Sequence, residues 1–439
     1  MDLLRFFNMT PSKPDAAEAV RDPRALRGDN DAIATAVASF LTRTGLFDRE
    51  AYLRTYPDVA KSGLDPLHHF VRVGIHLGRQ FTTLPTIARL WREVLREVAA
   101  TPPPVQLADP KRFHAAIYVS SRGNFFMREI ADVLKAGFDD LGVRADVRDE
   151  TGQPADATHH IVIAPHEFFV LGEGKRWAND VFVSRAIVFS TEQIQTQWFA
   201  RSLVFLLRAK AVVDMNEQNA AILRKAGVRA AAVQPGYSAG FAPLSKPRDG
   251  ASLPALASLT MAARNFDAAG APLAARPLDV LFLGSHSPRR AALLAGYAEK
   301  FSGLNAFIYY TRMTVPLDPA NNPTASTNAT AALLQRSKIL LNVHRDEYTY
   351  FEWWRLMQAF WLQTVVVTEP CFPHTLYKPG THYFEEAPRH IPHLIDWLAR
   401  SADGQARAED VRRRAFEDFA AHSTAKSAAL TLLQAGGAQ

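Results

Sequence analysis

Polar side chains follow two apolar, strand-like runs in the first half of the chain, where catalytic groups are expected. His166 and Glu167 come after HHIVIAP, and Glu192 and Gln193 come after AIVFST. A histidine or glutamate at a strand end can accept the proton of an attacking hydroxyl group. His166, Glu167 and Glu192 are therefore candidate catalytic bases. Loop solvation or strand-end capping is the alternative for each of the four positions, and it is favoured for at least two of them.

A glycine turn followed by two arginines makes a candidate phosphate site in the second half. In LFLGSHSPRR, Gly284 ends a predicted strand, and Ser285 and His286 lead into a predicted helix. Free N–H groups at a helix start attract phosphate, and Arg289 and Arg290 add positive charge. The dinucleotide fingerprint G-x-G-x-x-G is absent. An ordinary strand-to-helix turn is the alternative.

A third polar group follows the apolar run ILLNV. His344 and Arg345 come first, and a helix is predicted from about Tyr350 with Glu352, Arg355 and Gln358 on one side. Arginine can bind phosphate, while glutamate and glutamine can bind sugar hydroxyls. A solvated face with an internal Glu–Arg pair is the alternative. Glu369 follows VVVT, either as a site residue or as a turn residue before Pro370. The candidate binding residues of the second half are Gly284, Ser285, His286, His344, Arg345, Glu352, Arg355, Gln358 and Glu369.

Several other kinds of site find no support in the sequence. It contains no HExxH, Walker A or G-x-S-x-G motif and no D-x-D-like site that we assign to a metal. We therefore predict neither a metal requirement nor a cofactor. Cys371 is the only cysteine, so an intrachain disulfide is impossible.

Alternating strand-like and helix-like runs must position these candidates. The 439 residues, 48% apolar and 21% charged, suit two or three globular domains. Two alternating series predict two parallel sheets, whose carboxyl edges can face one another across a ligand cleft. The expected divisions are a poorly ordered leader (1–31), a helical module with a Pro-rich linker (32–104), a first Rossmann-like domain (105–245), a linker or insertion (246–276), a second Rossmann-like domain (277–400) and a helical tail packing back on the first domain (401–439).

Net charge and hydropathy limit the cellular locations and the binding partners that the sequence indicates. The net charge is +6, but no Lys/Arg-dense run appears, so nucleic-acid binding is disfavoured. The N-terminus has no signal-peptide pattern, and no apolar run reaches 18 residues, so we expect no spanning helix. The cytoplasm is the expected location. Leu3, Leu4, Phe6 and Phe7 would suit the inner face of the membrane, with a frayed terminus as the alternative.

The run from Ile339 to Glu369 resembles the donor half of GT-B glycosyltransferases. Those enzymes often carry a strand, a polar loop and an E-x-x-R-x-x-E/Q-A helix, which Glu352, Arg355 and Gln358 match. STEQIQTQWF, VVDMNEQNAAILRKAG and VQPGY resemble the acceptor half of a bacterial polysaccharide-type subgroup. The resemblance covers about 113–400. Gln358 stands where many relatives have Glu, and Gln363 stands where a helix-ending glycine is common.

A separate stretch, FDREAYLRTYPDVAKSGLDPLHHFVRVGIHLGRQ, is similar to a helical module with the motif F-D-x-x-Y-Y-x-x-x-Y-P-D-V. That module often accompanies bacterial glycosyltransferase domains. We interpret it as a packing or interaction module.

The resemblance implies transfer of a sugar from a nucleotide-activated donor to a glycan, lipid-linked or protein acceptor. Helix N-termini and basic side chains, rather than a metal, would neutralise the diphosphate. An inverting reaction would need a base from His166, Glu167 or Glu192, and a retaining one would not. Two alternatives remain: a catalytically weak GT-B-like binding or scaffold protein that recruits partners through the helical module, and a sugar-phosphate epimerase of the same architecture.

Overall fold

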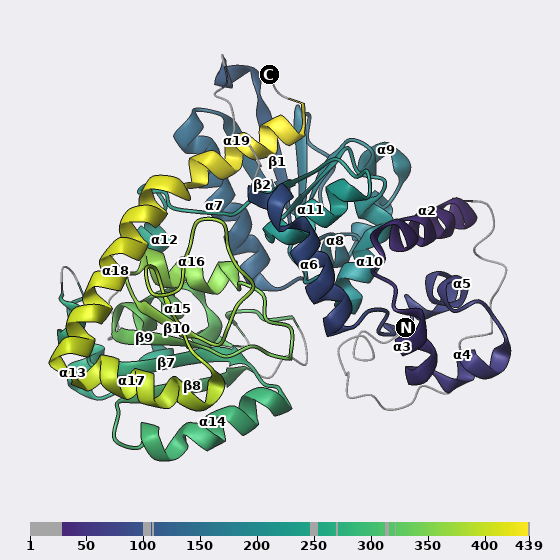
Figure 1. Cartoon of the computed structure of the whole chain (residues 1–439). Helices are drawn as coiled ribbons and strands as arrows, with labels where there is room; N and C mark the ends of the chain where they lie inside the picture. Colours follow the sequence, from purple (N-terminus) through teal and green to yellow (C-terminus); the bar gives the residue numbers. More distant parts are fainter. Residues whose placement is uncertain are drawn as a thin grey trace.

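The computed structural model describes residues 29–99, 107, 109–245, 253–268, 271–311, 316–320 and 322–437 (Figure 1). Residues 1–28 of the expected leader, with the candidate membrane-surface side chains Leu3, Leu4, Phe6 and Phe7, lie outside them. So do Pro102, Pro103 and Pro104 of the expected linker. The described chain forms a helical N-terminal module, two sheet domains and a C-terminal helical arm.

The N-terminal module contains helices α2 (Asp29–Thr44), α3 (Arg49–Thr55), α4 (Pro57–Ser62), α5 (Pro66–His69) and α6 (Leu84–Ala99), with a π-helical turn at Phe70–Gly74. Asp48 starts α3 by accepting a hydrogen bond from the Ala51 N–H at 2.9 Å, and Pro57 stands in the first turn of α4. The Tyr52 ring contacts the rings of Phe47 and Phe70. The residues that make this motif recognisable therefore build the module's own core.

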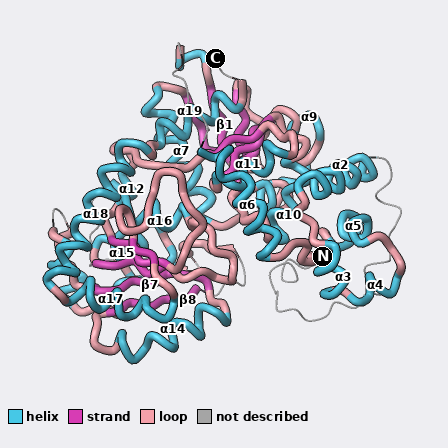
Figure 2. Tube along the Cα trace, in the orientation of Figure 1, coloured by secondary structure: helices cyan, strands magenta, loops and turns pink. Residues whose placement is uncertain are grey.

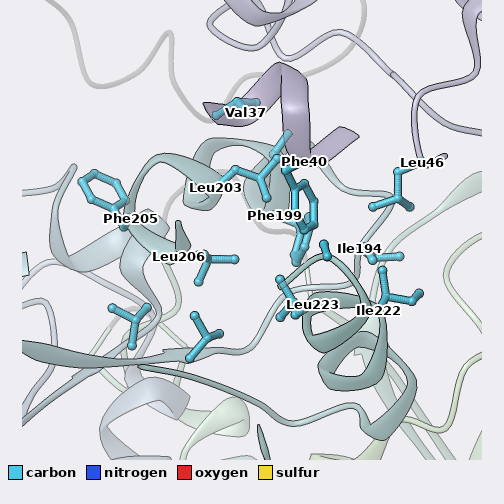
Figure 3. Packing of buried hydrophobic residues seen from close by; sticks show 14 of the residues in the cluster. Val37, Phe40, Leu46, Ile194, Phe199, Leu203, Phe205, Leu206, Ile222 and Leu223 are labelled. Carbon is cyan, nitrogen blue, oxygen red and sulfur yellow. The ribbon is translucent and has the colours of Figure 1, made fainter. Parts of the chain in front are cut away.

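The module packs on the first sheet domain through apolar side chains. Figure 3 shows Val37 and Phe40 of α2 beside Phe199 and Leu203 of α10 (Gln197–Leu206). All four side chains are buried in one cluster. Helix α6 packs on α11 (Glu217–Lys225). The module is thus joined to the first domain by a continuous core.

The first sheet has the order β2-β1-β3-β4-β5-β6, with parallel pairing throughout. Alternate side chains of its strands serve opposite cores: Ala116 and Tyr118 face one, and Ala115 and Ile117 face the other. The strands are β1 (His114–Tyr118), β2 (Arg144–Arg148), β3 (His159–Ile163), β4 (Ala186–Ser190), β5 (Ala211–Asp214) and β6 (Ala230–Ala232). The other helices are α7 (Phe125–Leu141), α8 (Pro165–Phe168) and α9 (Asp180–Val183).

The second sheet has the order β11-β10-β9-β7-β8 and is also parallel. Its strands are β7 (Leu278–Ser285), β8 (Ala306–Thr311), β9 (Ser337–Asn342), β10 (Val365–Thr368) and β11 (Phe384–Glu385). Its helices are α14 (Pro288–Phe301), α15 (Thr327–Gln335), α16 (Trp353–Trp361) and α17 (Ile391–Arg400). Short helices α12 (Ala242–Ser245) and α13 (Met261–Arg264) lie between the two sheets in sequence.

The C-terminal arm connects the two domains. Helix α18 (Ala402–His422) packs on α16 and α17, and α19 (Ala425–Ala435) packs on α7 of the first domain. The contact with α7 is close at Gly137, where a Cβ atom would lie 2.0 Å from the Ala425 carbonyl oxygen. Only glycine therefore permits α19 to approach α7 this closely.

The predicted fold class is confirmed. Two Rossmann-like parallel sheets form separate α/β domains behind a helical module, and Figure 2 shows their strands in two separate regions of the molecule. Residues of both domains line one cavity. In both sheets the first strand lies between the second and the third. The order in which successive strands are added therefore changes direction beside β1 in the first sheet and beside β7 in the second. Ligands of open parallel sheets bind at such points.

Candidate functional site

A cavity of about 340 Å³ lies between the carboxyl edges of the two sheets. We call its two sides the first-domain wall (125–129, 191–193 and 214–219) and the second-domain wall (283–285, 309–311 and 350–358). Six predicted site residues line it: Glu192, Gly284, Ser285, Glu352, Arg355 and Gln358. The other six, which are His166, Glu167, His286, His344, Arg345 and Glu369, do not contribute to the lining.

Glu192 and His166 form a pair on the first-domain side. The His166 Nε2 atom lies 3.4 Å from Glu192 Oε1, and Glu192 Oε2 accepts a hydrogen bond from the Thr196 hydroxyl at 3.4 Å. Burial lowers the pKa of His166 to about 3, so its imidazole is neutral at pH 7. Burial raises the pKa of Glu192 to about 7, against the Thr196 hydrogen bond and the nearby Arg345. Glu192 thus faces the cavity with His166 behind it.

Glu167 has a structural position. It accepts hydrogen bonds from the Asn124 N–H at 3.0 Å and from the Asn124 side-chain amide, which holds the loop after β1. A Cβ atom at Gly123 would lie 2.2 Å from Glu167 Oε2, so any larger residue there would displace this carboxyl group. Ala164, just before α8, has a φ of 50°, a left-handed conformation that turns the chain after β3.

Two further carboxyl groups on the first-domain wall were missed by sequence reasoning. Asp214 ends β5 and Glu129 lies on α7, and both face the cavity. Burial raises the pKa of Asp214 to about 7, against hydrogen bonds from Asn216, Ser190 and Asn219. Burial, with a smaller effect of nearby Asp132, raises the pKa of Glu129 to about 8. The position of Asp214 at the end of a predicted strand could have indicated a site residue. No sequence pattern could have indicated Glu129.

Charged groups on the second-domain side neutralise one another. Glu352 lies 3.3 Å from Arg355 Nε, 3.6 Å from Arg290 Nη2 and 3.5 Å from His344 Nδ1. Burial disfavours the Glu352 charge, but Arg355, His344 and Arg290 outweigh burial and lower the pKa of Glu352 to about 2. Helix α16 begins at Trp353, later than predicted, and leaves Glu352 at its N-cap position.

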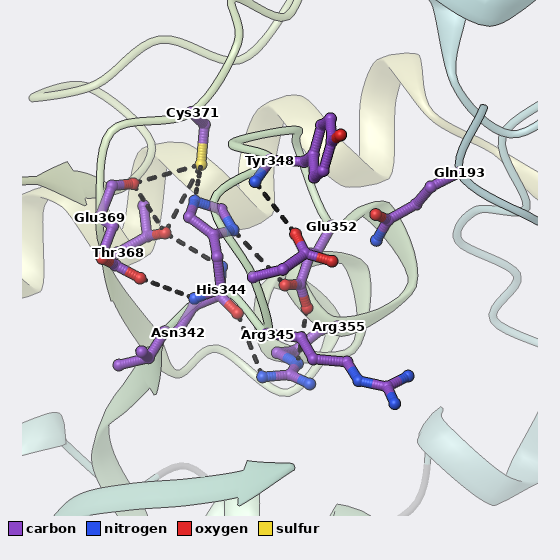
Figure 4. A network of polar contacts seen from close by, with 12 residues as sticks. Gln193, Asn342, His344, Arg345, Tyr348, Glu352, Arg355, Thr368, Glu369 and Cys371 are labelled. Atoms are coloured by element: carbon purple, nitrogen blue, oxygen red, sulfur yellow. Dashed lines mark hydrogen bonds and ion pairs between the residues drawn. The ribbon is translucent and has the colours of Figure 1, made fainter. Parts of the chain in front are cut away.

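His344 lies between Cys371 and Glu352 (Figure 4). Its Nε2 atom is 3.9 Å from the Cys371 sulfur and 3.2 Å from the Pro370 carbonyl oxygen. Burial opposes the imidazolium form, but Cys371 and Glu352 raise the pKa of His344 to about 10. His344 is 1% exposed and cannot reach a ligand without rearrangement. We therefore assign it a role in holding Glu352.

Glu369 is also part of the framework. It accepts hydrogen bonds from both Nη atoms of Arg289, one of them at 2.8 Å, and from the His344 N–H at 2.7 Å. Only 2% of its side chain is exposed. Glu369 and Arg289 therefore fix the loop after β9 against the start of α14.

The turn after β7 has fewer free N–H groups for a phosphate than its sequence predicts. Ser287 caps α14 by accepting from the Arg290 N–H at 3.1 Å, and Pro288 has no N–H. Gly284 is tightly enclosed, because a Cβ atom there would lie 2.9 Å from the Phe282 ring and 3.1 Å from Arg290 Nη1. The Ser285 hydroxyl accepts from Arg290 at 3.1 Å. His286 is exposed beside the Tyr310 ring.

Arg345 and Arg355 differ in what holds them. Arg355 donates to Asn342 Oδ1 at 3.1 Å and contacts Glu352. The Arg345 side chain is exposed, and within the described chain it has neither an ion-pair partner nor a side-chain hydrogen bond. It also acts electrostatically on Glu192 across the cleft. Arg345 is therefore the cation at this site that is free to bind an anion.

Aromatic side chains from both walls complete the lining, and no sequence pattern assigned any of them to the site. They are Phe125, Phe126, Tyr309, Tyr350, Phe351, Trp353 and Trp354. The Trp353 indole donates to the Pro235 carbonyl oxygen at 2.8 Å, so this ring also joins the second-domain wall to the first domain.

No group of three or more His, Cys, Asp or Glu side chains within the described residues is placed to hold a metal ion. Among the described helices, none is long and apolar enough to cross a membrane. Metal-independent chemistry stays a prediction.

No family model matches the chain, and no curated protein matches it in sequence. Solved structures overlap it distantly. The HepE protein of Anabaena in complex with UDP-glucose has 10% identity and a TM-score of 0.44, covering 73% of this chain and 98% of that one. An alpha-glucosyltransferase in complex with UDP and DNA has 9% identity and a TM-score of 0.46, covering 71% and 96%. Sucrose-phosphate synthase from Thermosynechococcus elongatus has 13% identity and a TM-score of 0.44, covering 74% and 98%. Identities this low carry no information on individual residues.

Proposed function

We propose that this protein transfers a sugar from a nucleotide-activated donor to a glycan, lipid-linked or protein acceptor. The supporting observation is the cavity itself, which lies at the carboxyl edges of two facing parallel sheets. One wall carries carboxyl groups that can accept a proton, and the other lies beside a free arginine. An inverting transfer from an anionic leaving group to a hydroxyl nucleophile uses a base for the nucleophile and a cation for the leaving group.

The donor diphosphate would bind on the second-domain side, where Arg345 supplies an unpaired positive charge. Gln358, 8% exposed and lining the cavity, would hydrogen-bond a ribose or sugar hydroxyl. Arg355 would contribute mainly by holding Glu352 and Asn342, although its planar group also suits a phosphate. Arg345, with Arg355 beside Glu352, would neutralise the diphosphate without a metal.

Glu192 is our candidate for the base of an inverting reaction. The acceptor oxygen attacks the anomeric carbon, the bond from that carbon to the phosphate oxygen breaks, and the nucleoside diphosphate leaves with the electron pair. The acceptor proton passes to Glu192, whose pKa near 7 suits proton transfer at neutral pH. His166 would act as a positioning residue behind Glu192. In a retaining reaction this proton transfer to Glu192 would not be required.

Binding of nucleoside diphosphates tests this proposal. UDP and UDP-glucose are the first probes, because they are the ligands of similar solved structures. We expect UDP to raise the melting temperature of the full chain, and incubation with a suitable sugar nucleotide to release the nucleoside diphosphate. Stabilisation by no nucleoside diphosphate, together with no donor consumption, would exclude the proposal.

Two arginine variants locate the diphosphate. Arg345→Ala should weaken UDP binding by roughly 1.5–3 kcal/mol, the value for a hydrogen bond to a charged group. Arg54→Ala, on the exposed surface of α3, is the matched control and should leave the affinity unchanged. Arg355→Ala should weaken binding and also lower stability, since it frees Glu352. Unchanged UDP affinity in Arg345→Ala would remove Arg345 from the site.

One observation favours a second candidate function, a catalytically weak binding or scaffold protein. Arg289, Arg290 and Arg355 are engaged by Glu369 and Glu352, which leaves little charge for a diphosphate. The N-terminal module would then recruit partners. Nucleotide binding without donor hydrolysis or transfer, over several sugar nucleotides and acceptors, would support this candidate. Release of a nucleotide together with a changed free sugar would instead indicate an epimerase.

A further inference from the structure

A second cavity, of about 540 Å³, lies among the chain segments that connect the two domains. We call it the linker cavity and define it by its lining, which comes from 237–276, Gln335, 361–363 and 409–416. The first segment joins the two sheets in sequence, and the last belongs to α18 of the C-terminal arm (Figure 1). No described residue lines both this cavity and the one between the two walls, so the linker cavity is a separate site.

Two buried N–H groups in the wall of the linker cavity have no acceptor among the described residues. They are Arg276 Nε and Trp361 Nε1. The two residues are 6% and 4% exposed, and both line the cavity. Buried polar atoms in folded proteins are almost always hydrogen-bonded, so two donors without acceptors in one cavity wall call for a ligand that supplies acceptors.

The other nitrogen atoms of Arg276 hold the ends of two helices. Nη1 donates to the Leu334 carbonyl oxygen of α15 at 3.2 Å, and Nη2 donates to the Leu362 carbonyl oxygen at the end of α16 at 3.2 Å. Nη1 also donates to the Ser337 carbonyl oxygen at 2.9 Å and to the Thr364 hydroxyl at 3.1 Å. Carbonyl groups at helix ends attract cations, which explains why an arginine is buried here. These contacts fix the guanidinium group and leave Nε without a partner.

Arg276 brings an unpaired positive charge to the linker cavity. Its acceptors are neutral oxygen atoms, and no described carboxyl group lies within ion-pair distance of it. Glu409, the acidic residue of the lining, instead accepts from Arg412 Nε at 2.9 Å and from Arg412 Nη2. Burial and the nearby Arg412 lower the pKa of Arg276 to about 10, against Glu409, so Arg276 is charged at pH 7. A ligand that supplies acceptors here is therefore expected to be an anion.

Three aromatic rings also line the linker cavity. The Trp361 and Tyr237 ring centroids are 5.3 Å apart, and Phe416 contacts Tyr237 edge-on with centroids 5.8 Å apart. Cavities of roughly 300–1,000 Å³ hold small organic ligands, and rings such as these contact their apolar parts. The volume and the rings therefore indicate an anion with an apolar body rather than a bare inorganic ion.

We propose that the linker cavity binds a small organic anion, whose carboxylate or phosphate oxygens accept hydrogen bonds from Arg276 Nε and Trp361 Nε1. Its apolar body packs against the rings of Tyr237, Trp361 and Phe416. The occupant contacts both 237–276 and α18, which lie on the two chain connections between the domains. This site is distinct from the proposed sugar-nucleotide site and does not depend on the proposed function.

Binding of small probes to the full chain tests the proposal. The probes are benzoate, phenyl phosphate, inorganic phosphate and benzamide, which has the shape of benzoate without its charge. Titration calorimetry and saturation-transfer NMR measure their affinities. We expect benzoate, phenyl phosphate or both to bind at least about tenfold more tightly than benzamide, the lower end of the effect of a hydrogen bond to a charged group. Their order distinguishes a carboxylate from a phosphate ligand. Inorganic phosphate should bind more weakly than the tighter of the two, because it has no body to contact the rings.

Trp361→Phe is the sharpest variant. It keeps an aromatic ring at the cavity and removes the Nε1 donor, which has no partner within the described chain. We expect about a tenfold lower affinity for the tighter aromatic anion. Arg276→Lys, which keeps the positive charge and removes Nε, is the second variant and should lower the affinity by a similar factor. Trp397→Phe is the matched control, because Trp397 is 41% exposed on α17 and does not line the cavity, and it should leave the affinity unchanged.

Arg345→Ala locates the bound anion. Arg345 acts on Glu192 of the first-domain wall, so an anion in the linker cavity should bind to Arg345→Ala as tightly as to wild type. An affinity that falls in Arg345→Ala and not in Trp361→Phe would place the anion between the two walls and overturn the proposal. So would unchanged affinity in both Trp361→Phe and Arg276→Lys, benzamide binding as tightly as both aromatic anions, inorganic phosphate binding more tightly than both, or binding of none of the anions at millimolar concentration.

Discussion

The two walls of the cavity contain the same acidic residue types in opposite electrostatic states. On the first-domain wall, burial without a contacting cation raises the pKa values of Glu129, Glu192 and Asp214 to about 8, 7 and 7. On the second-domain side, Arg355, His344 and Arg290 outweigh burial and lower the pKa of Glu352 to about 2. Pairing, more than burial, therefore decides whether a carboxyl group here exchanges protons or anchors cations.

The largest expected effect comes from the proton-exchanging wall. Glu192→Gln removes the proposed base, so we expect kcat to fall roughly 10²–10⁴-fold, the usual contribution of a general base. UDP affinity should stay nearly constant, because the nucleotide binds on the other side. Steady-state kinetics and UDP titration measure the two effects.

His166→Gln is the companion variant for Glu192. A positioning role predicts a smaller loss of kcat and a shift in the pH profile, since His166 Nε2 lies 3.4 Å from Glu192 Oε1. If Glu192→Gln kept full activity, the first-domain wall would lose its catalytic assignment. Equal losses of kcat and UDP affinity would indicate a structural role for Glu192.

Substitutions on the second-domain side, where carboxyl groups hold cations, should lower folding stability. Glu369→Ala leaves Arg289 and the His344 N–H without their shared partner, so we expect a loss of about 3 kcal/mol, as for other broken buried ion pairs. Denaturant unfolding of the full chain measures this loss of stability. Glu417→Ala is the matched control, because Glu417 pairs with Arg413 at 3.0 Å on the exposed surface of α18. There the loss should be below about 0.5 kcal/mol.

Much of this contrast was hidden from the sequence, although the fold was not. Apolar runs with polar ends predicted both sheets and brought Glu192, Gly284 and Glu352 to one cavity. The Arg289–Glu369 pair joins residues 80 positions apart, and no local pattern encodes such a contact. Asp214 stood at a predicted strand end but carried no motif.

Glu129 shows a different limit of sequence reasoning. Its helix is amphipathic, and a glutamate beside Arg128 is expected to be solvent-exposed. Glu129 is nevertheless 8% exposed, because it faces the interdomain cavity. Gln363, predicted as a departure from a helix-ending glycine, adopts the left-handed conformation with a φ of 54°. Its side chain accepts a hydrogen bond from Arg412, which holds the strained residue in place.

A smaller effect that distinguishes the two walls is the pH dependence of folding stability. The pKa of Glu129 is raised to about 8 in the folded protein, above its unfolded value. The folded state therefore binds the extra proton, and wild-type stability falls as pH rises from about 4.5 to about 8. The glutamine of Glu129→Gln is neutral at every pH, so its stability does not depend on this proton. We expect the variant to be more stable than wild type at pH 8 and equally stable at pH 4. Unfolding curves at both pH values measure the difference.

Glu352→Gln should show the opposite sign. The pKa of Glu352 lies near 2, below its unfolded value, so its stabilising contribution is present above about pH 4.5 and is lost as pH falls toward 2. The variant should be less stable than wild type at pH 7 and approach it at low pH. The same pH slope in Glu129→Gln and Glu352→Gln would contradict the distinction between the walls.

The smallest expected effect concerns the link between the N-terminal module and the second-domain wall. Gln80 of the module donates to the Tyr348 hydroxyl at 3.3 Å, and Trp91 of α6 contacts the Phe372 ring with centroids 4.6 Å apart. Tyr348→Phe removes one partly exposed hydrogen bond, so we expect a stability loss of about 0.5 kcal/mol. Because Tyr348 precedes Tyr350 and Glu352 of the second-domain wall, UDP affinity should fall slightly. Unfolding curves and UDP titration of the variant measure the two effects, and an unchanged UDP affinity would mean that the module does not act on the second-domain wall.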